Sequence, residues 1–458
     1  MSPFTGGQFG EPRITLNRRF LNTLLLLLLF RILAAIPILN VDEERIRHLL
    51  AQNPLIGTVD LFAGGDVINH FSIVAAGIFP YLLALMLVQA ACLLPSRLRQ
   101  MQRQGEKGKK RLELITKVLT VPVAFLFAWI LSHYLSQQVG LFPGQVRWFT
   151  AASFWPSLRI VCLVTLGSLI STAVVDLITR KGIGSGAEVV LVGGSGLVFV
   201  KQVSAALRDA PGKAVAVQWL GWITLGSLVV VVLSIYVMSA KRKIPVQYAR
   251  NPTSSRSPFS RRQQSYLPLL LNSGRVLPVS AGIGVLALLQ LSQDFFQVHA
   301  HSWAGALGHS MTDWATPASL WYWAALACLI IFFTYVYNFS VLWQRDEPIS
   351  ERLKKEGGFI PGLRPGQQTE QYLSRVVTDI SLPGGVGLAL LAAGLPCAVL
   401  QMTHQNLMVT ILSLIVVVTT VQALRDEVCA HRYSESYEGL LHPSRKKRLW
   451  DRLCGMDT

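Results

Sequence analysis

Ten long apolar segments run through this chain of 458 residues, and they constrain its fold more than any other feature. A helix needs about 20 mainly apolar residues to cross the hydrocarbon core of a bilayer. Only 15% of the residues are charged, whereas roughly 25% is usual in soluble domains. The pattern predicts an all-α integral membrane protein with ten transmembrane helices, near residues 20–39, 71–94, 114–138, 157–178, 187–204, 217–238, 274–292, 319–342, 377–400 and 404–424.

Several of these segments contain residues that a lipid-facing helix seldom carries. Segment 187–204 contains Gly193, Gly194 and Gly196, and segment 404–424 is rich in Ser and Thr. Such helices are expected to face a polar or dynamic interior of the bundle. Pro80 lies inside segment 71–94, where we expect it to kink the helix or to require local compensation.

The basic residues are distributed unevenly between the two sides of the membrane. The loops on one side contain 32 Lys and Arg residues and those on the other side contain 5. The positive-inside rule therefore predicts that both termini, residues 1–19 and 425–458, lie in the cytoplasm. Two loops on that side, 239–271 and 341–376, exceed 30 residues, and long loops of this kind usually have a function.

Loop 341–376 contains a Pro- and Gly-rich stretch that predicts a tight, non-helical turn with Arg364 at its tip. A rigid turn that presents one cation, close to Lys354 and Lys355, is suited to docking an acidic or phosphate-rich partner. An ordinary turn with a solvated Arg364 is equally compatible with the composition. Loop 239–271, which contains Arg261 and Arg262, is predicted to be a mobile basic arm that contacts lipid headgroups or, less commonly, RNA.

Charged residues inside or beside the apolar segments are candidates for a functional site. Arg31, Asp176 and Lys201 belong to this group, although the last two lie near enough to helix ends to reach water. The semi-apolar stretch 60–65 is either a re-entrant segment or an extracytoplasmic loop, and the loop is the commoner case. Glu188 follows the glycine-rich turn 182–186 and is a candidate capping carboxylate.

The six cysteines are scattered without a C-x-x-C pair, which predicts packing thiols rather than a disulfide framework or a metal site. We expect no cofactor and no metal. The glycines of 182–186 are not followed by the Lys-Ser/Thr of a phosphate-binding loop, so we interpret them as a turn between helices.

Seven motifs, in order along the chain, resemble the SecY/Sec61α family, and the resemblance runs from Arg18 to about Leu441. The most specific is the turn of loop 341–376. The motifs are Arg31 to Pro37, Leu61 to Gly65, Phe71 to Tyr81, Gly182 to Gly186, Ile244 to Tyr248, Tyr266 to Pro268 and Gly358 to Gly366.

The resemblance implies two pseudo-symmetric halves of five helices, 20–204 and 217–424, which an external hinge at 205–216 joins around a central pore. A plug near 59–69 would include Leu61, Phe62, Gly64 and Gly65. A ring of apolar side chains would close the pore at its waist, formed here by Ile73, Ile78, Leu191, Ser280 and Val409. Ser280 would weaken that seal, unless it faces another helix and bonds to its own backbone.

The family passes unfolded polypeptides across the cell membrane and sideways into the lipid, without a catalytic centre. The resemblance therefore implies SecE and SecG as membrane partners, and the SecA motor or a ribosome as the driver. The driver would dock on loops 239–271 and 341–376, where Arg261, Arg262, Lys354, Lys355 and Arg364 lie. The alternative is a secondary transporter with inverted repeats, which predicts a polar midplane site and paired, interrupted helices in the two halves.

Overall fold

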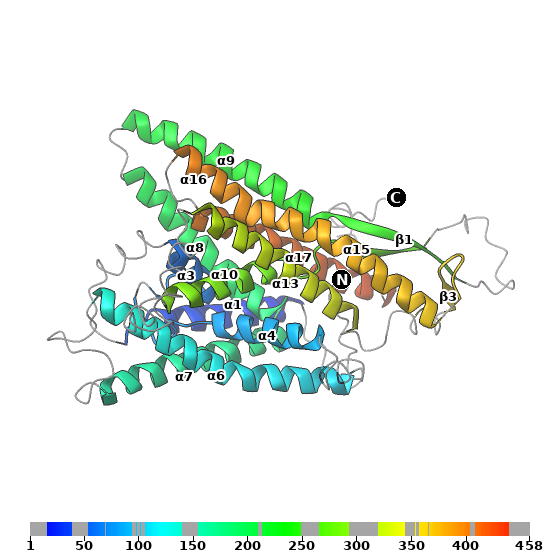
Figure 1. The fold of residues 1–458 in the computed structure, drawn as a ribbon, viewed down its shortest axis with the longest axis horizontal. Coiled ribbons are helices and arrows are strands. Elements are labelled where there is room, and N and C mark those ends of the chain that lie inside the picture. The colour runs from blue at the N-terminus through cyan, green and yellow to red at the C-terminus, as the bar shows by residue number, and fades with distance from the viewer. Residues whose placement is uncertain are drawn as a thin grey trace.

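The computed structural model describes a bundle of long helices with a small sheet at one end (Figure 1). It describes residues 16–38, 54–68, 70–93, 98, 101, 106–139, 154–208, 213–248, 265–292, 319–343, 353, 357–364, 366–403 and 408–438. The helices of the first part of the chain are α1 (Leu16–Ala34), α3 (Pro54–Ala63), α4 (Phe79–Leu93), α6 (Glu106–Val139), α7 (Phe154–Lys181), α8 (Gly186–Arg208) and α9 (Lys213–Ser239). The later ones are α10 (Leu277–Leu291), α13 (Leu320–Trp343), α15 (Gln367–Ala389), the π-helical turn η2 (Leu390–Gly394), α16 (Leu395–Thr403) and α17 (Met408–Glu438).

Seven helical spans in the described part are long and apolar enough to cross a membrane. They are α6, α7, α8, α9, α13, the continuous run from α15 through α16, and α17. The shorter helices α4 and α10 are also apolar, and α1 is a 19-residue helix that contains three Arg residues. Each of the ten predicted segments overlaps one of these helices, so the prediction of an all-α membrane protein is confirmed.

The outer faces of several helices carry large apolar side chains that the rest of the bundle does not cover. Helix α9, at the top of Figure 1, is the clearest case, because its apolar residues are exposed along most of its length. Apolar side chains on an outer face suit the hydrocarbon of a bilayer. Examples are Leu24 and Leu28 of α1, Leu114 and Val118 of α6, and Trp222, Leu228 and Tyr236 of α9.

Three early helices and three later helices lie on different sides of the bundle. In Figure 1, α4, α6 and α7 lie along the lower side, whereas α9, α15 and α16 lie along the upper side. Helix α8 packs against α17, and α4 packs against α10 and α13. Short α3 lies between these groups and contacts α8, α10 and α17.

The predicted segment 71–94 is helical only from Phe79 onward, so Pro80 does not kink a helix interior. It lies in the first turn of α4, where its missing N–H costs no intrahelical bond. Gly77 explains the irregular backbone before it. Gly77 has φ +50°, and a Cβ there would lie 1.8 Å from the carbonyl oxygen of Ala63.

The two long basic loops contribute strands to one antiparallel sheet, in the order β2-β1-β3. Strand β1 (Lys241–Tyr248) pairs with β2 (Ser265–Leu270) along Lys241–Val246, and with β3 (Gly358–Phe359) at Gln247 and Tyr248. The prediction of a mobile arm is therefore wrong for these strands. They form a small apolar core with α15, because side chains on one face of the strands pack against one face of that helix. The core contains Ile244, Val246, Leu269 and Ile360 from the strands and the turn after them, and Leu373, Val376, Val377 and Ile380 from α15.

The cysteines differ in one respect from the prediction. Cys92, Cys162, Cys328 and Cys397 are free thiols, as the spacing predicts. Cys429 is disulfide-bonded, so the expectation that all six are packing thiols is wrong at this position.

Candidate functional site

The semi-apolar stretch 60–65 is part of a short helix that lies deep inside the bundle. Leu61 and Phe62 of α3 are completely buried, and Ile56 and Val59 are nearly so. Such burial contradicts the interpretation as an extracytoplasmic loop. The structure instead places a ten-residue helix and the turn after it among longer helices, which corresponds to the re-entrant alternative.

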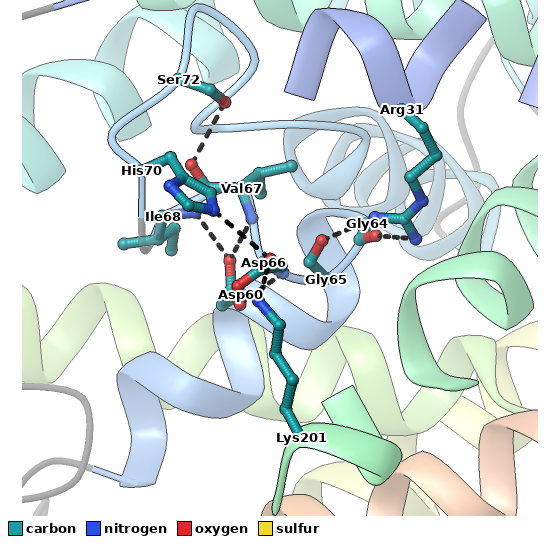
Figure 2. Close-up of polar contacts among 10 residues, drawn as sticks. All are labelled: Arg31, Asp60, Gly64, Gly65, Asp66, Val67, Ile68, His70, Ser72 and Lys201. Atoms are coloured by element: carbon teal, nitrogen blue, oxygen red, sulfur yellow. Dashed lines mark hydrogen bonds and ion pairs between the residues drawn. The ribbon is translucent and has the colours of Figure 1, made fainter. Parts of the chain in front are cut away.

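Arg31 of α1 fixes the turn that follows α3. Its guanidinium donates one hydrogen bond to the carbonyl oxygen of Gly64 and one to that of Gly65, both at 2.9 Å (Figure 2). The planar fork of a guanidinium suits two neighbouring acceptors, which an ammonium reaches less well. The charged residue in the first apolar segment therefore has a specific internal task, as the sequence analysis proposed for such positions.

Asp60 closes the same turn from inside. Its carboxylate accepts hydrogen bonds from the backbone N–H groups of Asp66, Val67 and Ile68, at 2.7, 2.9 and 2.7 Å (Figure 2). Burial raises the pKa of the Asp60 carboxyl to about 6, and the three N–H donors oppose that rise. The three N–H donors favour the ionised carboxylate, which accepts all three hydrogen bonds.

Asp66 links the turn to α8. Its carboxylate forms an ion pair with Lys201, near the end of α8, and lies 3.5 Å from Nε2 of His70 (Figure 2). Asp66 has φ 66°, a left-handed conformation that Asp tolerates better than most residues. Arg31 and Lys201 thus hold the same turn from two helices that are remote in sequence.

Glycines allow the turn to lie directly against α8. A Cβ on Gly194 would be 2.0 Å from the carbonyl oxygen of Gly64, and a Cβ on Gly65 would be 2.6 Å from that of Gly194. Gly196, two residues further along α8, has open space around it. The glycines predicted to face the bundle interior therefore have different roles, and Gly194 is the one that the close approach requires.

The residues predicted to form a ring are placed at several levels of the bundle. Ile78 and Leu191 are buried and flank the end of α3, since the Ile78 N–H bonds to Ala63 and α8 contacts Gly64. Val409 is also buried, but its neighbour Thr410 contacts Gln202. Gln202 lies eleven residues beyond Leu191 on α8, or about 16 Å at 1.5 Å per residue. Ile73, the remaining apolar member, is only partly buried.

Ser280 lies on α10, which runs antiparallel to α4. Its neighbour Ala281 packs with Met86 of α4, whereas Gly284 lies against Phe79 and Leu83. The Ser280 hydroxyl donates to the carbonyl oxygen of Leu277 at 2.8 Å. This local bond is the one that the sequence analysis named as the alternative to a place in the ring.

Among the predicted docking residues, the structure describes Arg364. It is exposed on a turn that contains Gly362 and Gly366, both with positive φ, as the Pro- and Gly-rich sequence predicts. Its carbonyl oxygen accepts a hydrogen bond from Thr369 at 3.0 Å, which fixes the turn to α15. The other predicted docking residues, Arg261, Arg262, Lys354 and Lys355, lie outside the described residues.

Sequence reasoning did not identify the acidic partners in this site, Asp60 and Asp66. The sequence indicated these two acidic residues only indirectly. Arg31 and Lys201 are cations in apolar segments, and each required a partner. The two carboxylates that flank Gly64–Gly65 were the nearest polar groups to the buried turn.

These features define a class of protein, namely a multi-pass membrane protein with a short buried helix at the centre of a helical bundle. A profile of the SecY family matches residues 72–424, and the chain therefore belongs to the SecY family. It is 29% identical over 441 residues to the protein translocase subunit SecY of Streptomyces scabiei, covering 93% of this chain and 97% of that protein. It is 30% identical over 401 residues to that of Mycobacterium leprae, covering 85% and 87%.

Solved structures share the fold at lower sequence identity. One, described as a protein-conducting channel, has a TM-score of 0.64 and 13% identity, and the match covers 96% of this chain and 97% of that one. Another, a SecY protein whose plug domain stabilises the closed state of its translocation channel, has a TM-score of 0.65 and 14% identity, with the same coverage. The fold predicted from the motifs is thus confirmed.

Proposed function

We propose that this chain is the central pore-forming subunit of a Sec protein translocase, which passes unfolded polypeptides across the membrane and sideways into the lipid. The observation that carries the proposal is the short helix α3 and its turn, which are buried at the centre of the bundle and joined to α1 and α8 by polar contacts. The relatives named above are translocase subunits, which supports the same activity for this chain. We also propose that it is a conduit rather than an enzyme, with energy supplied by a partner.

In the proposed resting state, residues 59–69 act as the plug and close the pore from one side. Leu61 and Phe62 fill the interior with apolar side chains, and Gly64 and Gly65 carry the contacts to Arg31 and α8. Ile78 and Leu191, beside the end of α3, would form the apolar constriction next to the plug, and Ile73, Ser280 and Val409 would line the pore at the other levels described above. An apolar constriction excludes water and ions because its walls offer no hydrogen bonds.

The passage of a chain would require the two halves, 20–204 and 217–424, to separate about the hinge at 205–216. Helices α4 and α10 pack against each other across the halves, so a parting between them would open a path to lipid. The bilayer would then select hydrophobic segments by their free energy of transfer.

The sheet of β1, β2 and β3 would be the docking platform for the driver. It joins the two basic loops into one unit, and exposed Arg364 lies on the turn that follows β3. Solved relatives include a Sec61 in a ribosome–channel complex, which supports a ribosome as one driver, and SecA is the other that we propose. SecE and SecG would brace the halves. We further propose that the protein lies in the cell membrane with both termini in the cytoplasm, since the loops on the side of the sheet together contain 32 of the 42 Lys and Arg residues.

Membership of the SecY family does not favour the alternative of a small-solute transporter. Reconstitution distinguishes the two functions. The purified complex in proteoliposomes, supplied with its driver, should protect a signal-bearing precursor from external protease. Protection should be lost when the signal sequence is removed. Uptake of a small solute without precursor protection would contradict the proposal.

A further inference from the structure

A second polar cluster joins the two halves of the bundle at the end that carries the sheet. Arg275, just before α10, lies with Nη1 3.5 Å from the Glu188 carboxylate in the first turn of α8 and with Nη2 3.5 Å from that of Asp426 on α17. The side chains of Glu188 and Arg275 are only 15% and 21% exposed. The pair thus connects helix α8 of the first half with helix α10 of the second.

The charges around Arg275 leave an acidic surplus. Glu427 lies beside Gly184, and Arg425 lies 3.4 Å from Asp426. The described cluster therefore contains three carboxylates, of Glu188, Asp426 and Glu427, and two guanidinium groups, of Arg275 and Arg425. Such a surplus is unexpected at the end of the protein where the loops are strongly basic, and it favours a cationic ligand.

In the proposed channel, Glu188 would lie on the path of an entering chain. It lies three residues before Leu191 on α8, so both side chains share one face of that helix. Leu191 belongs to the proposed constriction. The carboxylate of Glu188 is therefore about one helical turn outside the constriction, on the side of the docking platform.

Arg275 is held in a conformation that its sequence does not favour. Its backbone has φ 51°, which is uncommon for a residue other than glycine and carries a conformational cost. The Asn272 side chain fixes this turn by donating to the Arg275 carbonyl oxygen at 3.0 Å.

We propose that Glu188 is a docking carboxylate for the basic N-terminal region of an arriving signal sequence, and that Arg275 is its resting partner. Signal sequences begin with a positively charged region that precedes the apolar core. Exchange of one cation for another leaves Glu188 paired throughout, so the exchange avoids a buried, unpaired charge. It also releases α10 from α8, which couples recognition of the signal to separation of the halves. The proposal rests on the proposed channel function and assigns it a specificity-determining residue.

The test compares transport of precursors that differ only in the charge of the region before the apolar core. Purified complexes in proteoliposomes receive versions with no lysine, two lysines or four lysines there. The wild type should transport the four-lysine version faster than the uncharged one. Glu188→Gln should reduce that rate ratio severalfold, because the cations of the precursor lose their charged partner, while Glu188→Asp should retain it. Arg275→Gln, which frees Glu188, should increase the ratio.

Glu113→Gln is the matched control. Glu113 is a partly exposed carboxylate of α6 that pairs with Lys117, so its loss should leave the ratio unchanged. If Glu188→Gln does not assemble, the double variant Glu188→Gln with Arg275→Gln removes both charges and is tested instead. An unchanged ratio in the Glu188 variant that assembles would overturn the docking role. Failure of the wild type to transport any version would instead contradict the channel function.

Discussion

Arg31 illustrates how backbone carbonyl groups can bind a charge inside a membrane protein. Its guanidinium binds the carbonyl oxygens of Gly64 and Gly65, and it lies 5.9 Å from the ring of Phe30. Hydrogen bonds to a charged group typically contribute about 1.5–3 kcal/mol, so this contact is expected to hold the turn after α3 firmly. Asp60 supports the same turn from the opposite side, through three backbone N–H groups.

Gly194→Ala tests the close approach of the plug to α8. The added methyl group would overlap the carbonyl oxygen of Gly64, and overpacking of this kind costs about 1–3 kcal/mol. We expect the plug to be displaced and the resting ion conductance of planar bilayers to increase. Gly196→Ala is the control because its position is open, and equal conductance of the two variants would show that the contact does not hold the plug.

The ion pair of Asp66 with Lys201 can be tested by a double-mutant cycle. Asp66→Asn and Lys201→Gln should each increase the resting leak, because each loosens the turn from α8. The double variant should leak no more than the worse single variant. Lys201 is 55% exposed, so we expect a coupling of only about 0.2–1 kcal/mol. Strictly additive leaks would contradict the pairing.

The sequence predicted the cations of this site but not their partners. Arg31 and Lys201 could be identified because charges in apolar segments require compensation. Their partners lie 34 and 135 residues away in the chain, and no local periodicity reports a contact over such a distance. The positions of Gly64 and Gly65 in the plug motif were indicated only by resemblance to a family.

At the scale of elements, the sheet shows where charge obscured a strand. Strand β1 buries Ile244 and Val246 between exposed residues, which is the alternation of a half-buried strand. The Lys and Arg residues of the strand obscure this alternation, and their charge alone predicts a mobile arm. The turn around Arg364 was predicted well because Pro and Gly determine local backbone conformation, whereas α3 is too short for a window chosen for transmembrane helices.

Arg364→Glu tests the docking platform. Arg364 is exposed, so the variant should fold and insert normally while driver-dependent translocation falls at least tenfold, since a reversed charge repels an acidic partner. Arg375→Glu, at another exposed position on α15, is the control for a change in net charge and should retain most activity. Normal translocation in the Arg364 variant would show that this turn is not the docking site.

At the scale of the whole molecule, the apolar segments predicted the helices correctly. How far each helix is displaced along its own axis relative to its neighbours could not be predicted. Helices α8 and α17 run antiparallel, because Gly184 before α8 lies beside Leu424 whereas Gln202 contacts Thr410. Val409 is next to Thr410, and Leu191 lies eleven residues before Gln202, so the two residues lie at different levels. The level of a residue depends on how far each helix slides along its neighbours, and hydropathy does not encode that displacement.

The orientation of the whole molecule is testable by labelling of single engineered thiols in a background without exposed cysteines. A thiol at Arg364→Cys should react with an impermeant maleimide only after the cells are opened. A thiol at Ser302→Cys, in the loop 293–318 on the opposite side, should react in intact cells. The reverse pattern would contradict the predicted orientation of the basic loops.

Crosslinking of an arrested polypeptide tests the central claim most directly, because it asks whether a chain in transit passes through the centre of this bundle. A photoreactive side chain would replace Ile78 beside the end of α3 or, as the control, Leu228 on the exposed outer face of α9. With a precursor stalled halfway by a folded C-terminal domain, position 78 should crosslink to its hydrophilic mature region, and position 228 should not. Crosslinks to that region at position 228 but none at position 78, while the precursor is still translocated, would contradict a central pore.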